Sequence, residues 1–283
     1  MKFELKPIKK DKTRTVLIIV LVIGICLILY PSVANFWNQM TQTGAIASYE
    51  ESLTKLTKKD YTDFKNQAED YNRKLSGISC PLAHFESIPG YADLLNVNKN
   101  GMMGYISIDK IKVELPIYHG TSQEVLNVAV GHLQGSSLPV GGKGTNSVLT
   151  GHRGMPGAIL FTDLDQLNIG DTFTIDFLDQ RITYEIDQIC IVLPKETDQL
   201  KIDPDQDYCT LMTCTPYGVN THRILVRGVR IFNIKNKPLL HVTNESKQIH
   251  SLIVAPALGI PMLAVYFTAV FVHDKKKREA RKK

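Results

Sequence analysis

Apolar and polar positions alternate over short segments from residue 103 to residue 232. A period of two is typical of strands, because successive side chains of a strand point to opposite faces of its sheet. The segments that show it are 105–108, 112–117, 147–150, 172–177, 181–192, 208–214 and 223–232. Two short helices are expected near 122–130 and 157–164. The pattern predicts a mainly β protein with seven or eight strands in a closed or nearly closed barrel.

The segment before the barrel has a helical period instead. Between residues 38 and 76, apolar side chains recur at steps of three and four, and Gly77 is the expected stop. Residues 77–101 contain several Pro, Gly and Asn residues, which indicates a connector. We therefore expect a helical preface at 38–76, a connector at 77–101 and a barrel domain at 102–235.

Two long apolar runs flank this part of the chain. Residues 16–30 form an uninterrupted apolar stretch, and residues 252–272 carry no charge. A run of about 20 apolar residues is long enough to cross the ~30 Å hydrocarbon core of a membrane as a helix. We expect an N-terminal anchor at 15–37 and a C-terminal transmembrane helix at 252–272, with a linker at 236–251 before it.

Basic tails next to both runs indicate the topology. Residues 1–14 carry a charge of +4 and residues 273–283 a charge of +5, so that the residues between the tails carry −4 within the net +5 of the chain. Because Lys and Arg favour the cytoplasmic side, both termini are expected in the cytoplasm and the barrel outside the cell. The negative balance of the folded part argues against a nucleic-acid partner. A second reading of the first run stays open: Ser32-Val33-Ala34 is a plausible signal-peptide cleavage site.

One of the five cysteines stands at a strand end with a cation in reach. Cys214 closes the segment 208–214, turn residues follow, and Arg223 begins the next strand. A hairpin-like return would bring the two to the same end of a sheet, where a guanidinium favours the reactive thiolate. Cys190 lies in an apolar alternation and is expected to be an inert, buried thiol. Since no Cys-x-x-Cys pair occurs, a structural zinc site is not expected. No cofactor is expected either.

A proton carrier for the thiol is expected among the histidines. His152 follows the strand at 147–150 and lies in Gly151-His152-Arg153-Gly154, where the backbone can turn sharply and leave the imidazole free. The residues alone leave open whether it is catalytic or a hydrogen-bonded loop histidine. His119 and His132 also adjoin glycines, and Arg153 is a second candidate for the cation.

Several strings together resemble the sortases, the membrane-anchored cysteine transpeptidases of Gram-positive surfaces. The resemblance is carried by Thr150-Gly151-His152, by Thr210-Leu211-x-Thr213-Cys214 and by Arg223. The longer strings at 115–120, 135–139 and 213–223, together with the helical preface and the second apolar run, resemble the pilus-building class C subgroup. The similarity is close over residues 100–232 and extends to the rest in layout only.

The resemblance implies a sortase-type barrel flanked by transmembrane helices and assigns roles to site residues. Cys214 would be the nucleophile, His152 the proton carrier and Arg223 the residue that holds the substrate and steadies the oxyanion. Thr213 and Thr215 are expected to contact substrate, although Thr213 equally suits a strand.

The same resemblance implies substrates and partners. The expected substrate is a Leu-Pro-x-Thr-Gly-like sorting signal, cleaved between Thr and Gly through a thioacyl intermediate. The acceptor would be a lysine amine of another pilin subunit, so that the protein polymerises pili. Its partners would be pilin subunits and the cell membrane, which it would cross twice.

The connector departs from the class C pattern. Class C relatives usually carry an Asp-Pro-aromatic tripeptide there, whose side chains form a lid. The only Asp-Pro in this chain, Asp203-Pro204, is followed by Asp205. Two expectations stay open: an atypical lid that uses Cys80, His84 or Phe85, or an open site with an ordinary surface linker.

Three other functions compete with pilus polymerisation. A housekeeping sortase would attach surface proteins to the cell-wall precursor. A secreted cysteine hydrolase would pass the thioacyl group to water. An adhesive or scaffold domain would carry the cysteine and histidine incidentally.

Overall fold

The computed structural model describes residues 12–155 and 157–232, so the predictions for 236–251, 252–272 and 273–283 lie outside the described residues. The chain divides into one compact unit that contains residues 1–36 and a second that contains residues 37–239. Helix α1, Lys12–Leu53, includes a stretch that is long and apolar enough to cross a membrane.

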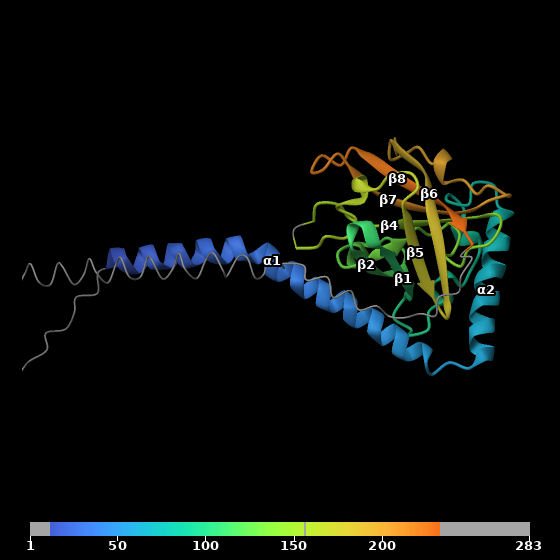
Figure 1. The fold of residues 1–283 in the computed structure, drawn as a ribbon, viewed down its shortest axis with the longest axis horizontal. Coiled ribbons are helices and arrows are strands. Elements are labelled where there is room, and N and C mark those ends of the chain that lie inside the picture. Colours follow the sequence, from blue (N-terminus) through green and yellow to red (C-terminus); the bar gives the residue numbers. More distant parts are fainter. Residues whose placement is uncertain (1–11, 156, 233–283) are drawn as a thin grey trace, which may run out of the picture. The chain divides into compact units, whose positions relative to one another are not determined.

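Eight strands form one closed barrel (Figure 1). They are β1 Met102–Ile108, β2 Val113–His119, β3 Val130–His132, β4 Thr145–Thr150, β5 Thr172–Phe177, β6 Gln180–Val192, β7 Asp207–Thr215 and β8 His222–Ile231. The order around the barrel is β1-β2-β3-β4-β7-β8-β6-β5, and β5 closes on β1. The pairs β2–β3 and β4–β7 are parallel, and the other pairs are antiparallel. The predicted closed, mainly β barrel is confirmed.

The helical preface consists of the last turns of α1 and a second helix, α2, Lys58–Ser76. Thr57 and Asp60 form a capping box at the start of α2, and Gly77 is its C-cap, where the sequence indicates a stop. The remaining short helical elements are α3 Gln123–Leu126, η1 Phe85–Ser87, η2 Tyr91–Asp93, η3 Asp109–Ile111, η4 Leu164–Gln166 and η5 Asp198–Leu200.

One local prediction from the sequence is wrong. Residues 157–164 form turns rather than a helix, because Gly157 and Leu160 adopt positive φ angles that a right-handed helix does not allow. The short helix expected near 122–130 is confirmed as α3, after which the chain enters β3. Strand β3 was not expected, since it has three residues with a glycine at its centre and shows no alternation.

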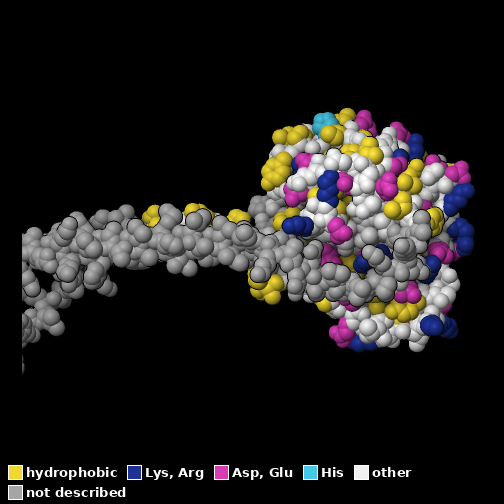
Figure 2. All heavy atoms as spheres, viewed as in Figure 1, with side chains coloured by type: hydrophobic (Ala, Val, Ile, Leu, Met, Phe, Trp, Pro, Cys, Tyr) yellow, Lys and Arg dark blue, Asp and Glu magenta, His cyan; other side chains and the backbone are white. Residues whose placement is uncertain are grey.

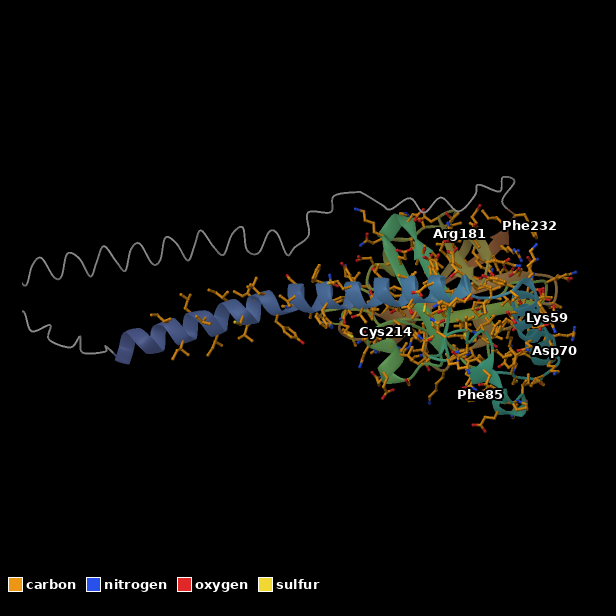
Figure 3. The ribbon with its side chains drawn as sticks, turned by 90° about the horizontal axis from the view of Figure 1, so that it is seen from below. Lys59, Asp70, Phe85, Arg181, Cys214 and Phe232 are labelled. Carbon is orange, nitrogen blue, oxygen red and sulfur yellow. The ribbon has the colours of Figure 1, made fainter. Side chains whose placement is uncertain are left out.

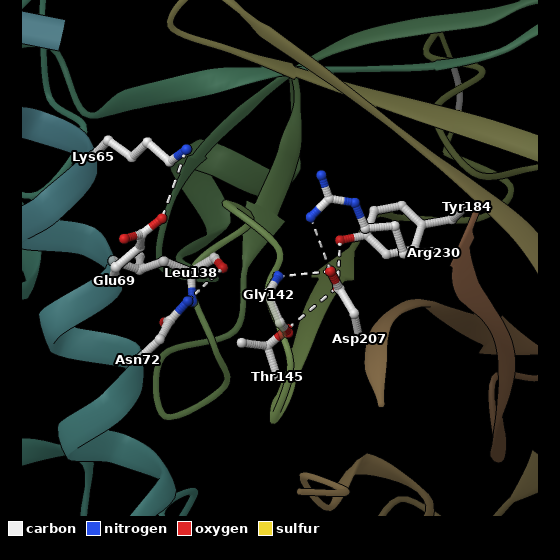
Figure 4. A network of polar contacts seen from close by, with 9 residues as sticks. All are labelled: Lys65, Glu69, Asn72, Leu138, Gly142, Thr145, Tyr184, Asp207 and Arg230. Atoms are coloured by element: carbon white, nitrogen blue, oxygen red, sulfur yellow. Dashed lines mark hydrogen bonds and ion pairs between the residues drawn. The ribbon is translucent and has the colours of Figure 1, made fainter. Parts of the chain in front are cut away.

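Alternate strand residues fill the barrel interior. The rings of Phe173 and Tyr184 stack there with centroids 5.4 Å apart. The preface packs on the barrel through the buried Asn72 of α2, whose amide exchanges two hydrogen bonds with the backbone of Leu138, at 2.7 and 3.1 Å (Figure 4). Other buried members of the core are Ile106, Ile108, Ile117, Phe161, Ile175, Phe177 and Leu211.

A carboxylate at the start of β7 ties four segments together (Figure 4). Asp207 accepts hydrogen bonds from Gly142 N at 2.6 Å, Tyr184 OH at 3.1 Å, Arg230 Nη1 at 3.2 Å and Thr145 Oγ1 at 3.3 Å. Partly buried, charge-assisted bonds of this kind resist displacement of either partner. They fix the position of β7, whose far end carries Cys214.

Replacing Gly104 with alanine is expected to destabilise the barrel by about 2 kcal/mol, because a buried methyl group without space forces strand β1 to shift. A Cβ at Gly104 would overlap the carbonyl oxygen of Asp176 on β5. The measurement is the thermal unfolding of the full chain in detergent. Gly44→Ala is the matched control, since a Cβ there meets nothing within 4 Å. Equal midpoints for the two variants would contradict the close β1–β5 approach.

Candidate active site

Strands β7 and β8 carry the predicted nucleophile and cation. Their antiparallel register places Cys214 directly opposite Arg223. Opposed residues of such a pair share one face of the sheet, with Cβ atoms about 5 Å apart. Leu211 and Thr213 are buried, whereas Cys214 is partly exposed, so the thiol and the guanidinium belong to the outer face of the barrel.

The segment after β4 brings His152 to the same end of the barrel. Strands β4 and β7 pair in parallel, with Thr150 level with Met212. The pairing continues for one more residue, because Gly151 N donates to Met212 O at 3.2 Å and Thr213 Oγ1 donates to Gly151 O at 2.6 Å. His152 is the next residue of this segment, so it lies level with Cys214 of β7. In Figure 3, Cys214 lies at the end of the barrel away from Lys59 of α2.

The two threonines beside the nucleophile hold the site together. Thr213 is buried, and its hydroxyl binds the backbone just before His152, so it positions the imidazole segment from inside the barrel. Thr215 Oγ1 accepts a hydrogen bond from Arg153 Nη1 at 3.3 Å. Both contacts link the end of β7 to the loop that follows β4.

Burial controls the protonation of His152. Its Nε2 is buried and has no hydrogen-bond partner within the described part of the chain. Desolvation disfavours the imidazolium and lowers the pKa of His152 below 6.5. A neutral imidazole with a spare nitrogen can take a proton from a thiol and later deliver it to a departing amine.

The two candidate cations have different surroundings. Arg153 forms an ion pair with Asp165 and also binds Thr215. Arg223 donates only to backbone carbonyls, at 3.0 Å to His222 and 3.2 Å to Asn220, and among the described residues no carboxylate pairs with it. Its charge is therefore available to the thiol and to a developing oxyanion, which favours Arg223 over Arg153 as the site cation.

An apolar groove with a volume of about 310 Å³ adjoins Arg223. Met212 and Leu225, which face each other across β7 and β8, form part of its wall. Its other lining residues are Leu82, Phe85, Leu133, Gln134, Val192, Leu193, Pro194, Glu196, Thr197 and Leu200. The groove can hold an extended peptide with apolar side chains against the outer face of the barrel.

The connector forms one side of this groove. Leu82 and Phe85 line it, and a Cβ on Gly135 would come within 2.9 Å of the Leu82 Cα, so the connector packs closely on the β3–β4 loop. Of the three residues suggested for an atypical lid, Phe85 faces the groove. Cys80 and His84 are exposed.

The other two glycine-flanked histidines belong to a buried network. His132 Nδ1 accepts from Tyr91 OH at 2.8 Å, and its Nε2 donates to Ser137 O at 2.8 Å. His119 Nδ1 binds Gly101 O at 2.8 Å and its ring meets the Tyr91 ring edge-on, with centroids 4.9 Å apart. These contacts give both histidines a structural role, so of the three glycine-flanked histidines only His152 lies beside Cys214.

The buried network predicts a loss of stability in acid. Burial lowers the pKa of His132 to about 4 from 6.5, and it lowers the pKa of His119 as well. Between these pH values the unfolded chain binds a proton that the folded chain does not, so stability falls as pH drops from 6.5 toward 4, by up to about 3 kcal/mol for His132. Denaturation midpoints of the full chain from pH 7.5 to 4.5 measure this.

The acid-stability experiment has two comparison variants. His84→Asn, at an exposed position, should keep the pH dependence of the parent. His132→Gln should be less stable at neutral pH, because it disturbs the bonds to Tyr91 and Ser137, but should lose less stability on acidification. An unchanged pH slope in His132→Gln would refute the assignment.

A thiol, an imidazole and a guanidinium at one end of a closed barrel define a site for acyl transfer through a thioester. Comparison with known proteins agrees with this chemistry. A family model described as the sortase domain matches residues 106–231. The chain belongs to the sortase family, whose members are cysteine transpeptidases.

Solved structures place the chain near one subgroup. It is 46% identical to sortase C1 from Streptococcus agalactiae, with a TM-score of 0.62, over 67% of this chain and 98% of that chain. It is 38% identical to sortase C from Clostridium perfringens SM101, with a TM-score of 0.57, over 67% of this chain and 99% of that one. The structural similarity is therefore to class C sortases.

Curated relatives match at lower identity. Sortase A of Listeria monocytogenes is 27% identical over 217 residues, which are 76% of this chain and 90% of that protein. The match spans 66% of the length of Bacillus anthracis sortase A and 63% of Bacillus subtilis sortase D.

Sequence reasoning missed most of the groove. Its walls come from the connector, the β3–β4 loop and the 192–200 segment, which are far apart in the chain. Their apolar residues carry no local motif, so only the folded barrel brings them together.

Proposed function

We propose that this chain is a membrane-anchored class C transpeptidase that cleaves a Leu-Pro-x-Thr-Gly-like sorting signal and joins it to a lysine amine of a second pilin subunit. The supporting observation is the pairing of Cys214 with Arg223 across β7 and β8, with His152 extending β4 beside them. In this proposal the chain crosses the membrane twice and both termini are cytoplasmic.

The first half of the reaction forms a thioester. The Cys214 thiolate attacks the carbonyl carbon of the signal threonine, and Arg223 stabilises the negative charge that develops on the oxygen. The Thr–Gly bond then breaks, and the His152 imidazolium protonates the departing glycine nitrogen. The threonine remains bound to the sulfur as a thioacyl group.

The second half transfers the acyl group. A neutral lysine amine attacks the thioester carbonyl and gives its proton to His152, while the carbon–sulfur bond breaks and restores the thiolate. One amide is exchanged for another, so the reaction needs no nucleotide. The apolar groove beside Arg223 would hold the Leu-Pro part of the signal, because its walls are mainly aliphatic and aromatic.

Product analysis tests the proposal and separates its competitors. The full chain in detergent is incubated with a pilin that carries the signal, with and without an amine of the cell-wall precursor type, and products are identified by mass spectrometry. A Thr–Lys isopeptide bond between subunits is the expected product. Release of a free threonine carboxylate even with excess pilin would indicate a hydrolase. Transfer only to the amine of a cell-wall precursor would indicate a housekeeping sortase, and no reaction would leave a non-enzymatic barrel.

We further propose that the connector is an apolar lid, supported by the position of Phe85 and Leu82 in the groove. Phe85→Ala should raise kcat/KM for a soluble signal peptide about fivefold, because the open form becomes a larger fraction of the population. His84→Ala, on the same connector but exposed, is the control. A decrease in kcat/KM for Phe85→Ala would instead make Phe85 part of the substrate site, and no change would indicate a surface linker.

A further inference from the structure

Two side chains of helix α1, at the start of the unit that contains residues 37–239, form hydrogen bonds with loops of the barrel. Asn38 Nδ2 donates to Gly157 O at 2.7 Å, and Gln42 Nε2 donates to Val128 O at 2.7 Å. Asn38 directly follows Trp37, where the N-terminal apolar stretch ends. At a rise of 1.5 Å per residue, both contacts lie within about 8 Å of Trp37 along the helix axis.

The turn between β7 and β8 lies against the same loop. A Cβ on Gly154 would come within 2.8 Å of the Tyr217 ring, and the Arg153 guanidinium carbon is 6.0 Å from the centre of that ring. Gly154 and Gly157 belong to the one loop that follows His152. The end of the barrel that carries the active site is therefore the end held by the Asn38 and Gln42 contacts.

Exposed apolar side chains gather on these segments. The exposed fractions are 71% for Trp37, 59% for Met40, 60% for Tyr217 and 64% for Val219. Val128 and Ile159 are exposed as well. We call these six residues the apolar rim. Figure 2 shows hydrophobic side chains at the surface on this end of the barrel.

The segments that carry the rim also lack charge. No Asp, Glu, Lys or Arg occurs in residues 37–47, 125–133, 154–162 or 216–221. Four separate segments at this end are therefore both uncharged and apolar at the surface, and clustered exposed apolar side chains mark protein or membrane interaction sites. Trp and Tyr side chains at such a boundary are typical of a membrane interface, where the ring is apolar and one atom is polar.

We propose that the apolar rim rests on the lipid surface of the membrane that holds α1, so that the active-site end of the barrel faces the bilayer. The rim is continuous with the membrane-spanning stretch through Trp37, and its uncharged segments lose no charge solvation on contact with lipid. The consequence for the substrate rests on the proposed function. A sorting signal that leaves the same membrane would reach Cys214 over a short distance.

Lipid contact can be measured without any activity. The full chain carries one tryptophan, so Trp37→Phe gives a background without tryptophan fluorescence. Into it, Val219→Trp or Ile159→Trp places a reporter on the rim, and Lys59→Trp places one on α2, away from Cys214 (Figure 3). Each variant is reconstituted in phosphatidylcholine vesicles that contain lipid brominated near the headgroup end of its acyl chains.

The expected result is strong quenching of both rim reporters and at least about threefold weaker quenching of the Lys59→Trp reporter, because bromine quenches only on near contact. Equal, weak quenching at all three positions would overturn the proposal and would leave the rim as a surface for a protein partner. Turnover of a soluble signal peptide by Val219→Trp and Ile159→Trp is measured in parallel. Quenching without turnover would count against the proposed function alone, and turnover without quenching against the rim proposal alone.

Discussion

Cys214→Ala will abolish cross-linking, with a loss of at least about 10⁴-fold in kcat/KM, because no other group at the site can form the thioester. The measurement is the rate of isopeptide formation between pilin subunits in the presence of detergent-solubilised full chain. The β7–β8 register places Arg223 directly opposite Cys214, so its thiolate has a cation as its cross-strand neighbour.

Cys190→Ala is the control for this variant. Cys190 lies on β6 opposite Leu225, and burial raises the pKa of its thiol. It should retain the parent rate. A rate that survives in Cys214→Ala, or that is lost in Cys190→Ala, would move the nucleophile to another residue.

His152→Ala is expected to lower kcat/KM by about 10³-fold, the usual loss when a general acid–base is removed. Because burial lowers the pKa of His152, its ionisation should produce one limb of the pH profile of kcat/KM below the usual histidine range. That limb should disappear in the variant. The measurement is kcat/KM for a soluble signal peptide from pH 5 to pH 9.

The matched control for His152→Ala is His222→Ala. His222 is also close to the site, opposite Thr215, but its Nδ1 contacts Thr221 Oγ1 at 2.9 Å. It should keep both the rate and the pH profile within a few fold. Similar losses in the two variants would show that neither histidine is the specific proton carrier.

Much of the barrel could be predicted from the sequence because seven of its strands alternate clearly. Strand β3 could not, since Gly131 interrupts its only three residues. The helix expected at 157–164 failed because Gly157 and Leu160 take left-handed conformations that the apolar spacing does not reveal. The spacing of apolar residues reflects local propensity, whereas the conformation of these two segments is determined by contacts with neighbouring parts of the barrel.

The active site, too, could be predicted from the sequence only in part. The pairing of Cys214 with Arg223 follows from a hairpin and could be predicted from the turn between them. His152 reaches the thiol through the parallel β4–β7 pair, which joins segments about sixty residues apart. Residue types and spacing could not establish that pairing, and the resemblance to the sortases supplied the expectation.

The connector shows what a motif search leaves out. The Asp-Pro-aromatic lid of class C relatives is missing from the sequence, yet Leu82 and Phe85 line the groove beside Arg223. Their contacts are with apolar residues that three separate segments contribute. A lid of this kind depends on contacts that exist only in the folded protein. The sequence could therefore offer it only as an alternative to an ordinary surface linker.

The location of the covalent intermediate decides whether Cys214 is the nucleophile. The full chain is incubated with a Leu-Pro-x-Thr-Gly peptide without amine, quenched in acid, and the digest is examined by tandem mass spectrometry. The expected adduct is the peptide up to its threonine, bound as an acyl group to the Cys214 sulfur and released on addition of a lysine amine. An adduct on a different residue, or turnover with no adduct on Cys214, would contradict it.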